Sequence, residues 1–405
     1  MTIFPHQTIS QGGDLFEKAG ALDRTLRGLR RVAAVLVVSL VIGAKLGAAA
    51  VPEKGANLKD VYGKAFLIGA AMNRDEVSGR SPAAERIVCA HYNTITPEND
   101  MKWDSLQPRA GEFNFASADR YVEFGRKHGL AVIGHTLVWH SQTPAWVFTG
   151  PDGKPASREL LLARMEAHIQ TVVGRYRGKI KGWDVVNEAV SDGPEMLRPS
   201  PWLTIIGADF LEKAYEFAHA ADPDAELYYN DYSLENDRKR ENAIQLLKNL
   251  KAKGVFLTGV GLQGHYNLHW PETVEIDRTI RAFAELGLKV MITELDIDVL
   301  PRAWNDNSAD VGKSYASDPQ LNPYVEGLPH VQQERLSARY GELFAVFLKN
   351  QKDLTRVTFW GVADGGSWLN HFPVRGRTNY PLLFDRGYRP KPAYEAVLQA
   401  ASLNK

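Results

Sequence analysis

The sequence contains almost no cysteine and no excess of charge of either sign. Cys89 is the single cysteine among 405 residues, so no internal disulfide can form. Lysine plus arginine and aspartate plus glutamate both number 48, which gives no basic surface of the kind that nucleic acids bind. We therefore expect no nucleic acid partner, whereas a neutral polymer is compatible with this balance.

Motifs of phosphate and metal sites are missing as well. Residues 69–73 come nearest to a Gly-rich phosphate loop, but they keep only the first of its three glycines. His135, His140 and His265 do not form a His-x-His or Cys cluster with ligand spacing. No internal repeat, Pro-rich linker or low-complexity tract separates a second domain. The sequence therefore predicts no metal, no cofactor and a single catalytic domain.

The N-terminal segment has the order of a secretory signal. Arginines cluster within residues 24–31, a mostly apolar stretch follows over 32–42, and a run of small residues ends at Ala50. This stretch is shorter than the roughly 20 residues that span a bilayer. We predict a cleaved signal over 1–50, a mature domain over 51–405, and export to the periplasm or the medium. No stable membrane anchor is then expected; an uncleaved anchor or a buried helix is the alternative.

From residue 62 onward, short β-rich runs alternate with longer segments of helical spacing. The short runs predict eight strands, at 65–71, 92–96, 131–135, 182–186, 226–230, 259–264, 290–294 and 357–362. Helices with one apolar face are predicted, for example, at 160–176, 210–220, 243–253, 276–286 and 331–349. Such alternation implies a parallel sheet, and eight units predict a closed (β/α)8 TIM barrel of the α/β class.

Polar side chains follow the predicted strands at the end where such barrels build active sites. The strand ends read ITPEND, GHTLVWH, WDVVNEA, YYNDY, LQGHY, ITELDID and FWGVAD. A long polar stretch over 301–329 follows the seventh strand at this same end, either as part of a site or as a surface excursion. A purely structural barrel has no need for these groups on one rim, so we predict an active site there.

Glu188 and Glu294 are the best pair of catalytic carboxylates. Each follows an apolar run, and their strands, the fourth and the seventh, lie on opposite sides of the barrel mouth. Glycoside hydrolysis needs one carboxyl that protonates the leaving oxygen and another that attacks the anomeric carbon or activates water. Asn187 is placed to hold a sugar hydroxyl. His265 is placed to orient Glu294, and Asp296 to orient His265.

Aromatic residues also gather at or just beyond the strand ends. Flat rings edged by polar groups are surfaces on which sugars stack, whereas a single such residue is more often part of the core. As a group, we interpret them as sugar-binding residues; they are Trp103, Trp139, Trp146, Trp360, Trp368, Tyr232 and Tyr266.

Taken together, these stretches resemble glycoside hydrolase family 10, the endo-β-1,4-xylanases, from about residue 58 to 398. The motifs, in order, are TPENDMKW, GHTLVWHSQTPAW, WDVVNEA, LYYNDY, GLQGHY, ITELDID, FWGVADGGSWL, YPLLFD and PKPAY. The resemblance implies an endo-acting, retaining enzyme on a TIM barrel. We expect it to act as a monomer on xylan and xylo-oligosaccharides.

Matched position by position, the resemblance implies that Glu188 is the acid/base and Glu294 the nucleophile. It places His265 and Asp296 in a relay behind the nucleophile. Around the sugar at the cleavage site it places Asn187, His135, Trp139 and Gln263. Around the next sugar toward the non-reducing end it places Glu98, Asn99 and Lys102. It places Trp360 and Trp368 over both of these sugars, and Tyr232 on the leaving side.

Two positions depart from the family pattern. Ala363 stands where threonine is common and Asp100 where glutamate is common, both beside the catalytic positions.

Three other functions stay open. A β-1,4-glucanase would differ from a xylanase only in its substrate, because glucose carries a hydroxymethyl group that xylose lacks. A metal-dependent barrel hydrolase and a non-catalytic sugar-binding barrel are the remaining alternatives.

Overall fold

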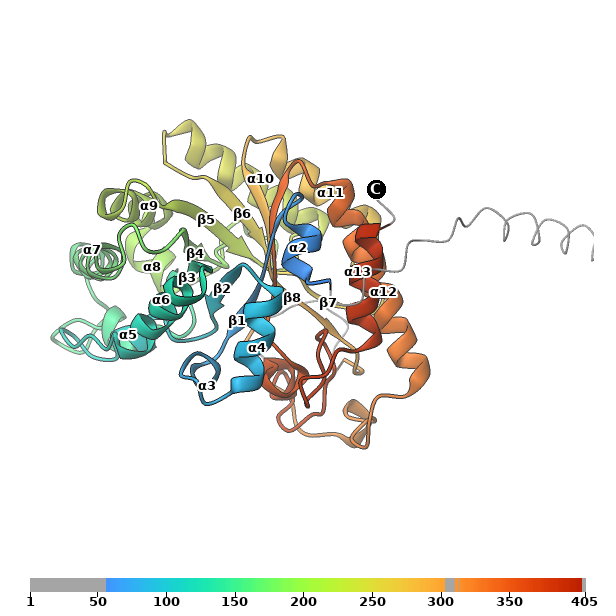
Figure 1. Cartoon of the computed structure of the whole chain (residues 1–405). Coiled ribbons are helices and arrows are strands. Elements are labelled where there is room, and N and C mark those ends of the chain that lie inside the picture. Colours follow the sequence, from blue (N-terminus) through green and yellow to red (C-terminus); the bar gives the residue numbers. More distant parts are fainter. Residues whose placement is uncertain (1–55, 303–309, 313, 403–405) are drawn as a thin grey trace, which may run out of the picture. The chain divides into compact units, whose positions relative to one another are not determined.

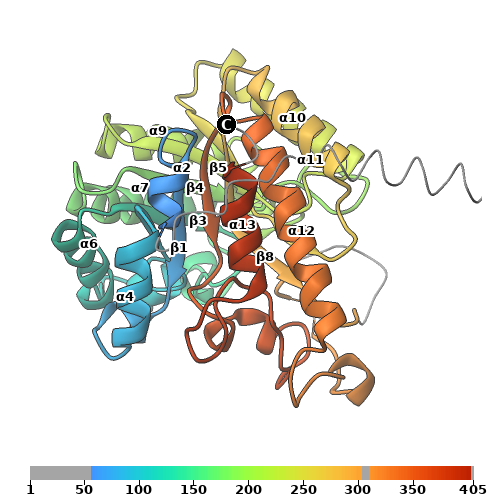
Figure 2. The ribbon, with the colours of Figure 1, turned by 45° about the vertical axis from the view of Figure 1, so that its right-hand side comes forward.

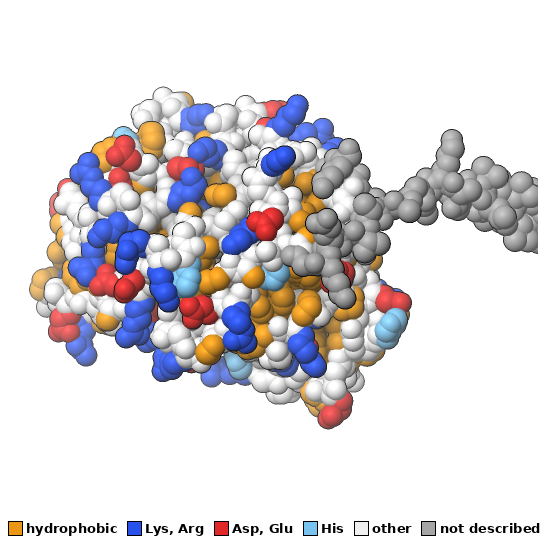
Figure 3. All heavy atoms as spheres, viewed as in Figure 1, with side chains coloured by type: hydrophobic (Ala, Val, Ile, Leu, Met, Phe, Trp, Pro, Cys, Tyr) orange, Lys and Arg blue, Asp and Glu red, His pale blue; other side chains and the backbone are white. Residues whose placement is uncertain are grey.

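The computed structural model describes residues 56–302, 310–312 and 314–402. The predicted signal over 1–50 lies outside these residues. Within the described ranges, none of the helices combines the length and the apolar composition that crossing a membrane requires. The face of the molecule in Figure 3 shows basic and acidic side chains interspersed, as the equal totals in the sequence suggest.

The core of the fold is a closed barrel of parallel strands. β1 pairs with β2 and β9, and the order continues through neighbouring strands until β6 pairs with β8 and closes the ring. β6 and β7 are two parts of the sixth strand, because both pair with β8. The strands are β1 (Leu67–Met72), β2 (Thr94–Pro97), β3 (Ala131–Trp139), β4 (Gly182–Asn187), β5 (Glu226–Asp231), β6 (Gly259–Leu262), β7 (His265–Asn267), β8 (Lys289–Asp298) and β9 (Leu354–Phe359). The predicted TIM barrel is therefore confirmed.

All eight apolar runs form strands, but the bounds of three differ clearly from the prediction. β3 continues to Trp139 instead of ending at residue 135. β8 continues to Asp298 instead of ending at residue 294, so Glu294 lies within a strand. β9 starts at Leu354 rather than at 357 and ends before Trp360. Arg356 caused the error at β9, because a charged residue does not suggest a buried strand. Its guanidinium is buried and lies 5.2 Å from the Tyr228 ring.

Helices surround the barrel (Figure 1). The longer ones are α4 (Pro82–His91), α6 (Ala116–His128), α7 (Arg158–Arg175), α9 (Phe210–Ala221), α10 (Asp237–Ala252), α11 (Thr273–Ala284), α12 (His330–Lys349) and α13 (Pro392–Ser402). Short helices and 3-10 turns lie between them: α2 (Leu58–Tyr62), α3 (Arg74–Val77), α5 (Trp103–Leu106), η1 (Ala145–Phe148), α8 (Pro201–Ile206), η2 (Pro319–Leu321), η3 (Asp364–Gly366) and η4 (Trp368–Asn370). Figure 2 shows α12 and α13 side by side, with α2 next to α13.

The five predicted helices are confirmed as α7, α9, α10, α11 and α12. α10 starts well before residue 243, because the Asn236 side chain accepts a hydrogen bond from Lys239 N and caps a polar first turn. α11 shows how these helices attach to the barrel. Its buried Ile276, Ile280 and Phe283 recur at helical spacing. Burial of each such side chain stabilises the fold by about 1.5–3 kcal/mol relative to exposure.

Candidate active site

One pocket at the carboxyl ends of the strands collects nearly all predicted site residues. Its volume is about 170 Å³. All predicted site residues line it except Asp296, which lies behind His265, and Tyr232. The lining comprises Glu98, Asn99, Lys102, His135, Trp139, Gln142, Asn187, Glu188, Gln263, His265, Glu294, Val311, Trp360 and Trp368. Parallel strands bring their carboxyl ends to one rim, which explains how residues so distant in sequence meet.

Glu188 is held by its backbone as well as by its side chain. It directly follows β4 and has a φ of 57°, a conformation that costs a non-glycine residue about 1–3 kcal/mol. Its N–H donates to Asn230 O at 2.9 Å, and its carbonyl accepts from Arg198 Nε at 3.1 Å. These contacts hold the backbone in this conformation and aim the carboxyl into the pocket.

The Glu188 carboxyl receives only neutral donors. Trp139 Nε1 donates to Oε2 at 2.8 Å, and Gln263 Nε2 donates to Oε1 at 2.9 Å. Asn187 Nδ2 lies 3.2 Å from Oε1. Burial raises the pKa of Glu188, and the bonds from Gln263 and Trp139 only partly oppose this. The environment therefore favours a carboxyl that keeps its proton.

Glu294 has a different set of partners. It lies where the register between β8 and β9 shifts, and its N–H donates to Gln263 O at 2.6 Å. Asn230 Nδ2 donates to its Oε1 at 2.7 Å, and His265 Nε2 lies 3.2 Å from its Oε2. Burial alone raises the pKa of Glu294. The His265 bond, electrostatic interactions with His135 and His265, and the Asn230 bond together outweigh burial and lower the pKa. This carboxylate is therefore kept ionised.

His265 is fixed between two carboxylates. Its Nδ1 lies 3.0 Å from Asp296 Oδ1 on the side opposite Glu294, and Trp368 Nε1 donates to Asp296 Oδ2 at 2.7 Å. Burial by itself would lower the pKa of His265, but the charge and bond of Asp296 and those of Glu294 raise it to about 10. The imidazolium thus carries both protons at neutral pH and donates to each neighbour.

Asn230 is a site residue that sequence reasoning missed. Its Nδ2 donates to Glu294 and also to Asn187 Oδ1 at 2.9 Å, so two amides join the environments of the two glutamates. Gly261 leaves room for it, since a Cβ there would lie 2.3 Å from Asn230 Oδ1. The signal was available, because Asn230 is the polar residue near the end of the fifth strand in YYNDY.

Lys102, Asn99 and Gln142 form a polar group on another wall. Lys102 Nζ donates to Asn99 Oδ1 at 3.0 Å and to Gln142 Oε1 at 2.8 Å, and it lies 4.9 Å from the centroid of the Trp139 ring. Burial lowers the pKa of Lys102, against the opposing charges of carboxylates that include Glu294 and Glu98. Gln142 was not predicted, although it lies within the GHTLVWHSQTPAW motif.

Two tryptophans and a histidine form a rigid part of the pocket wall. The His135 ring meets Trp360 edge-on, with centroids 5.3 Å apart, and its Nδ1 lies 2.9 Å from Asp184 Oδ2. The centroid of Trp368 lies 4.8 Å from that of His265. His135 and Trp368 are therefore each held by an aspartate as well as by ring packing, which suits a surface that must keep one shape.

The grouping of all seven aromatic residues as sugar-binding residues is wrong for two of them, and for a third, Trp146, which does not line the pocket, it stays a prediction. Trp103 is buried and stacks on His168 with centroids 3.7 Å apart. The Tyr266 hydroxyl donates to Glu235 at 2.5 Å inside the core. Trp146 packs against the core, with the Arg164 guanidinium 5.4 Å from its ring. A position near a strand end does not tell which way a ring points.

Tyr232 does not line the pocket. Its side chain is 1% exposed, and Lys239 Nζ lies 3.5 Å from the centroid of its ring. Its hydroxyl contacts Asp192 and Arg198. In this structure no ring face is open to a sugar, so the predicted stacking would require a rearrangement. This role stays a prediction.

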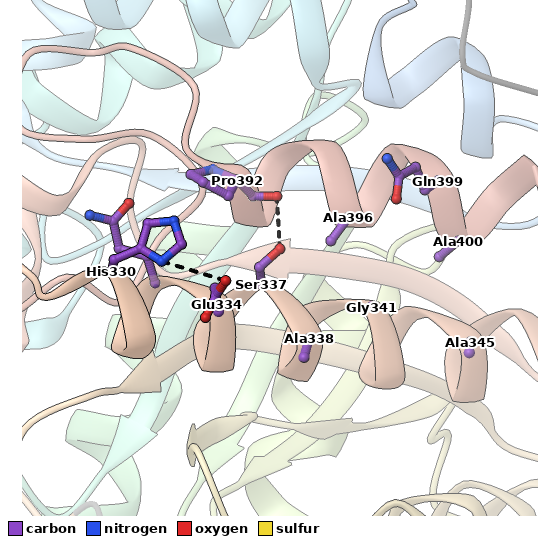
Figure 4. Close-up of a pocket in the computed structure, with 11 residues that line it drawn as sticks. His330, Glu334, Ser337, Ala338, Gly341, Ala345, Pro392, Ala396, Gln399 and Ala400 are labelled. Atoms are coloured by element: carbon purple, nitrogen blue, oxygen red, sulfur yellow. Dashed lines mark hydrogen bonds and ion pairs between the residues drawn. The ribbon is translucent and has the colours of Figure 1, made fainter. Parts of the chain in front are cut away.

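A larger pocket, of about 690 Å³, lies elsewhere, between α12 and α13 (Figure 4). Small side chains such as Ala338 and Ala396 line it, and Ser337 Oγ donates to Pro392 O at 3.0 Å across it. It contains no pair of carboxylates. The smaller pocket is therefore the chemical site, and from the polar stretch 301–329 it includes Val311; residues 303–309 and 313 lie outside the described residues.

No group of three or more His, Cys, Asp or Glu side chains in the described part of the chain could hold a metal ion.

Comparisons with known proteins agree on one family. The model of glycosyl hydrolase family 10 matches residues 57–400. "Endo-1,4-beta-xylanase A" of Xylanibacter ruminicola is 44% identical over 87% of this chain and 95% of its own length. "Beta-1,4-xylanase" of Dictyoglomus thermophilum is 43% identical over 85% of this chain and 90% of its own. A GH10 endoxylanase from a sugarcane soil metagenome has a TM-score of 0.82 at 45% identity, covering 84% of this chain and 99% of its own.

Proposed function

The chain belongs to glycosyl hydrolase family 10, and from this premise we propose that it cleaves β-1,4-xylosidic bonds within xylan chains, with retention of configuration. Two observations support this. The similar proteins named above are xylanases matched over most of their length. One further similar structure, with a TM-score of 0.75 and 37% identity over 85% of this chain and 99% of its own, is a complex with xylotriose.

In the first step, Glu188 acts as the acid and Glu294 as the nucleophile. The Glu188 carboxyl gives its proton to the glycosidic oxygen as the bond to the anomeric carbon breaks. A Glu294 oxygen attacks this carbon from the opposite face and forms a glycosyl ester. The raised pKa of Glu188 and the lowered pKa of Glu294 suit these two roles.

In the second step, Glu188, now ionised, takes a proton from water while the water oxygen attacks the anomeric carbon. The bond to Glu294 breaks, its carboxylate is released, and Glu188 regains its proton. Two inversions give net retention. Asn187, which lies between Glu188 and Asn230, is placed to hold the hydroxyl next to the reacting carbon.

We propose xylan rather than β-1,4-glucan because of Trp360 and Trp368. A glucose ring carries a hydroxymethyl group at C5, whereas xylose has only hydrogens there. Rings that close over the sugars on the non-reducing side would clash with this group. His135 and His265 fix the two tryptophans, which limits how far they can retreat.

The contrast between the Glu188 and Glu294 environments carries this proposal, and product analysis tests it. Purified protein and a Glu294→Ala variant would be incubated with xylan and with a soluble β-1,4-glucan, and products resolved by size and anomeric form. Early release of short β-anomeric xylo-oligosaccharides, lost in the variant, is expected. Preferred turnover of glucan would overturn the substrate, and early α-anomers would overturn retention. Binding without turnover would leave a sugar-binding barrel.

The remaining parts of the proposal concern the setting of the enzyme. The charged, apolar and small-residue order of residues 24–50 supports a cleaved signal over 1–50, with the catalytic domain over 51–405 acting outside the cytoplasm. We also expect the protein to act as a monomer. Mass spectrometry of the secreted protein and gel filtration would test these points; a mass that retains residues 1–50 would contradict cleavage.

A further inference from the structure

Tyr229 on β5 contacts the turn that follows Glu188. Its side chain is completely buried, and β5 pairs with β4, the strand that ends just before Glu188. Because side chains alternate across a strand, Tyr229 and Asp231 share the face of β5 opposite that of Asn230. Asn230 donates to Glu294, whereas Tyr229 and Asp231 are not among the described residues that line the pocket. Tyr229 can therefore act on the site only through other residues.

The Tyr229 hydroxyl uses its full hydrogen-bonding capacity. Its oxygen accepts from Ala189 N at 3.1 Å and from Val190 N at 2.9 Å. It donates its proton to Asp231 Oδ2 at 2.5 Å. A hydroxyl has two acceptor lone pairs and one donor, so these three bonds saturate it. Within the described residues, this oxygen is the one acceptor that the structure gives to Ala189 N.

Asp231 keeps the phenol hydroxyl in this orientation. Its other oxygen, Oδ1, accepts from Tyr232 N at 2.9 Å and lies 3.0 Å from Lys239 Nζ. Asp231 and Lys239 are both buried, so this carboxylate is held on both of its oxygens. Because Asp231 takes the phenol proton, the lone pairs of the phenol oxygen face the two amide N–H groups of the turn.

The bond from Ala189 completes the set of contacts that fix the backbone of Glu188. The peptide before Glu188 is held through its N–H, which donates to Asn230 O at 2.9 Å. The peptide after it is held at both ends, because its carbonyl accepts from Arg198 Nε at 3.1 Å and its N–H donates to Tyr229. Peptides are planar, so fixing both planes fixes φ of Glu188 at 57° and the direction of its Cα–Cβ bond.

The nucleophile does not depend on such contacts. Glu294 lies within β8, in a strand conformation that any residue type adopts without strain. Glu188 would instead relax toward a negative φ if the peptide after it were released, and its carboxyl would then move away from its place in the pocket. Loss of the Tyr229 hydroxyl should therefore impair the acid and spare the nucleophile.

We propose that Tyr229 is a positioning residue that holds Glu188 in the conformation required to protonate the leaving group. This inference rests on the proposed function. Tyr229 acts through the peptide that joins Glu188 to Ala189. Its hydroxyl therefore increases the rate where the departing group needs a proton from Glu188, and has little effect where that group leaves without one.

The variant Tyr229→Phe removes the hydroxyl and keeps the ring. Tyr228→Phe is the matched control, because Tyr228 is the neighbouring buried tyrosine on β5 and its hydroxyl donates to Glu226 at 3.0 Å. The substrates are two aryl β-xylobiosides, one that releases phenol, a poor leaving group, and one that releases dinitrophenol, which departs as a stable anion. The ratio of kcat/KM between the two substrates cancels any difference in the amount of folded protein.

The ratio of kcat/KM for the phenyl to the dinitrophenyl substrate should fall about tenfold in Tyr229→Phe and stay unchanged in Tyr228→Phe. For the dinitrophenyl substrate, kcat should fall together with KM, because the water of the second step still needs Glu188 as base. An equal loss of kcat/KM on both substrates would overturn the proposal, since it would show a structural role only. No loss on either substrate would also overturn it.

A second variant covers the case in which Tyr229→Phe does not fold, which circular dichroism would reveal. Asp231→Asn replaces a charged acceptor of the phenol proton with a weaker neutral one and so loosens the same contacts. A lower phenyl-to-dinitrophenyl ratio in Asp231→Asn would support the positioning role, and an unchanged ratio would overturn it.

Failure of the proposed function would be visible separately, in the unaltered protein. If this protein cleaved the matching aryl β-cellobiosides and neither xylobioside, the substrate would be wrong, and the same ratio measured on cellobiosides would test Tyr229. If it cleaved none of the four, the catalytic proposal would fail and this inference with it. If the unaltered protein is active and Tyr229→Phe keeps its ratio, this inference alone fails.

Discussion

The two sides of the active-site pocket surround the same residue type with different chemistry. Around Glu188 the hydrogen-bond donors are an indole and two amides, all neutral, and burial raises the pKa. Around Glu294 a histidine held cationic by Asp296 donates together with Asn230, and the pKa falls despite equal burial. A charged donor is thus what separates an acid from a nucleophile at this rim.

The largest expected effect comes from removing each glutamate in turn. Glu294→Ala and Glu188→Ala should each lower kcat on xylo-oligosaccharides by at least about 10³-fold. Added azide should separate them. In Glu294→Ala it attacks the substrate directly and gives an α-xylosyl azide after one inversion. In Glu188→Ala, assayed with an aryl xylobioside, it attacks the covalent intermediate and gives the β-azide. The same anomer from both variants would contradict the assignment.

The substitution His265→Gln should make the surroundings of Glu294 resemble those of Glu188, because only neutral donors then remain. The variant loses the positive charge that keeps the pKa of Glu294 low, so this pKa rises. Because the reaction requires ionised Glu294, the acidic limb of kcat/KM should move to higher pH, with a loss on the order of 10²-fold at the optimum. Exposed His269→Gln is the control. An unmoved acidic limb would show that His265 does not set this pKa.

Gln263→Met makes a smaller change on the acid side. It removes a neutral donor that lowers the pKa of Glu188. That pKa should rise further, and the basic limb should move to higher pH because the reaction requires protonated Glu188. We expect about a tenfold lower kcat/KM. Gln170→Met, exposed on α7, serves as the control. If the acidic limb of kcat/KM moved instead, this result would contradict the comparison of the Glu188 and Glu294 environments.

Glu76 extends the comparison to a buried carboxyl outside the catalytic pair. Burial raises its pKa to about 7. The folded state then holds a proton that the unfolded state releases, so this group's contribution to stability falls as pH rises from about 4.5 to 7. Glu76→Gln should abolish this loss and, near pH 8, be more stable by on the order of 1 kcal/mol.

Urea unfolding at several pH values would measure this difference, with exposed Glu123→Gln as the control. Equal pH dependence in Glu76→Gln and the unaltered protein would show that burial does not raise the pKa of a carboxyl at this rim, and would weaken the same reasoning for Glu188.

The strands could be predicted because a parallel barrel buries both faces of each strand, so apolar runs mark them. The start of β9 could not, since Arg356 is a charged residue that is nevertheless buried, beside the Tyr228 ring. Glu188 and Glu294 could be predicted because each follows an apolar run, although Glu294 lies within β8 and not at its end. The stacking of Trp103 on His168 and the cover over Tyr232 could not, because strand-end position does not fix where a ring points. Asn230 was overlooked within YYNDY because its importance depends on two hydrogen bonds that its Nδ2 donates, to Asn187 and to Glu294 on neighbouring strands.

Direct titration of the two glutamates tests the central claim most directly. The carboxyl carbons would be labelled with ¹³C and followed by NMR against pH, with Glu188→Gln and Glu294→Gln used to assign the two resonances. We predict that Glu188 titrates above the ordinary range of a glutamate and Glu294 below it. A Glu294 resonance that titrates at the higher pH of the two would contradict the assignment of acid and nucleophile.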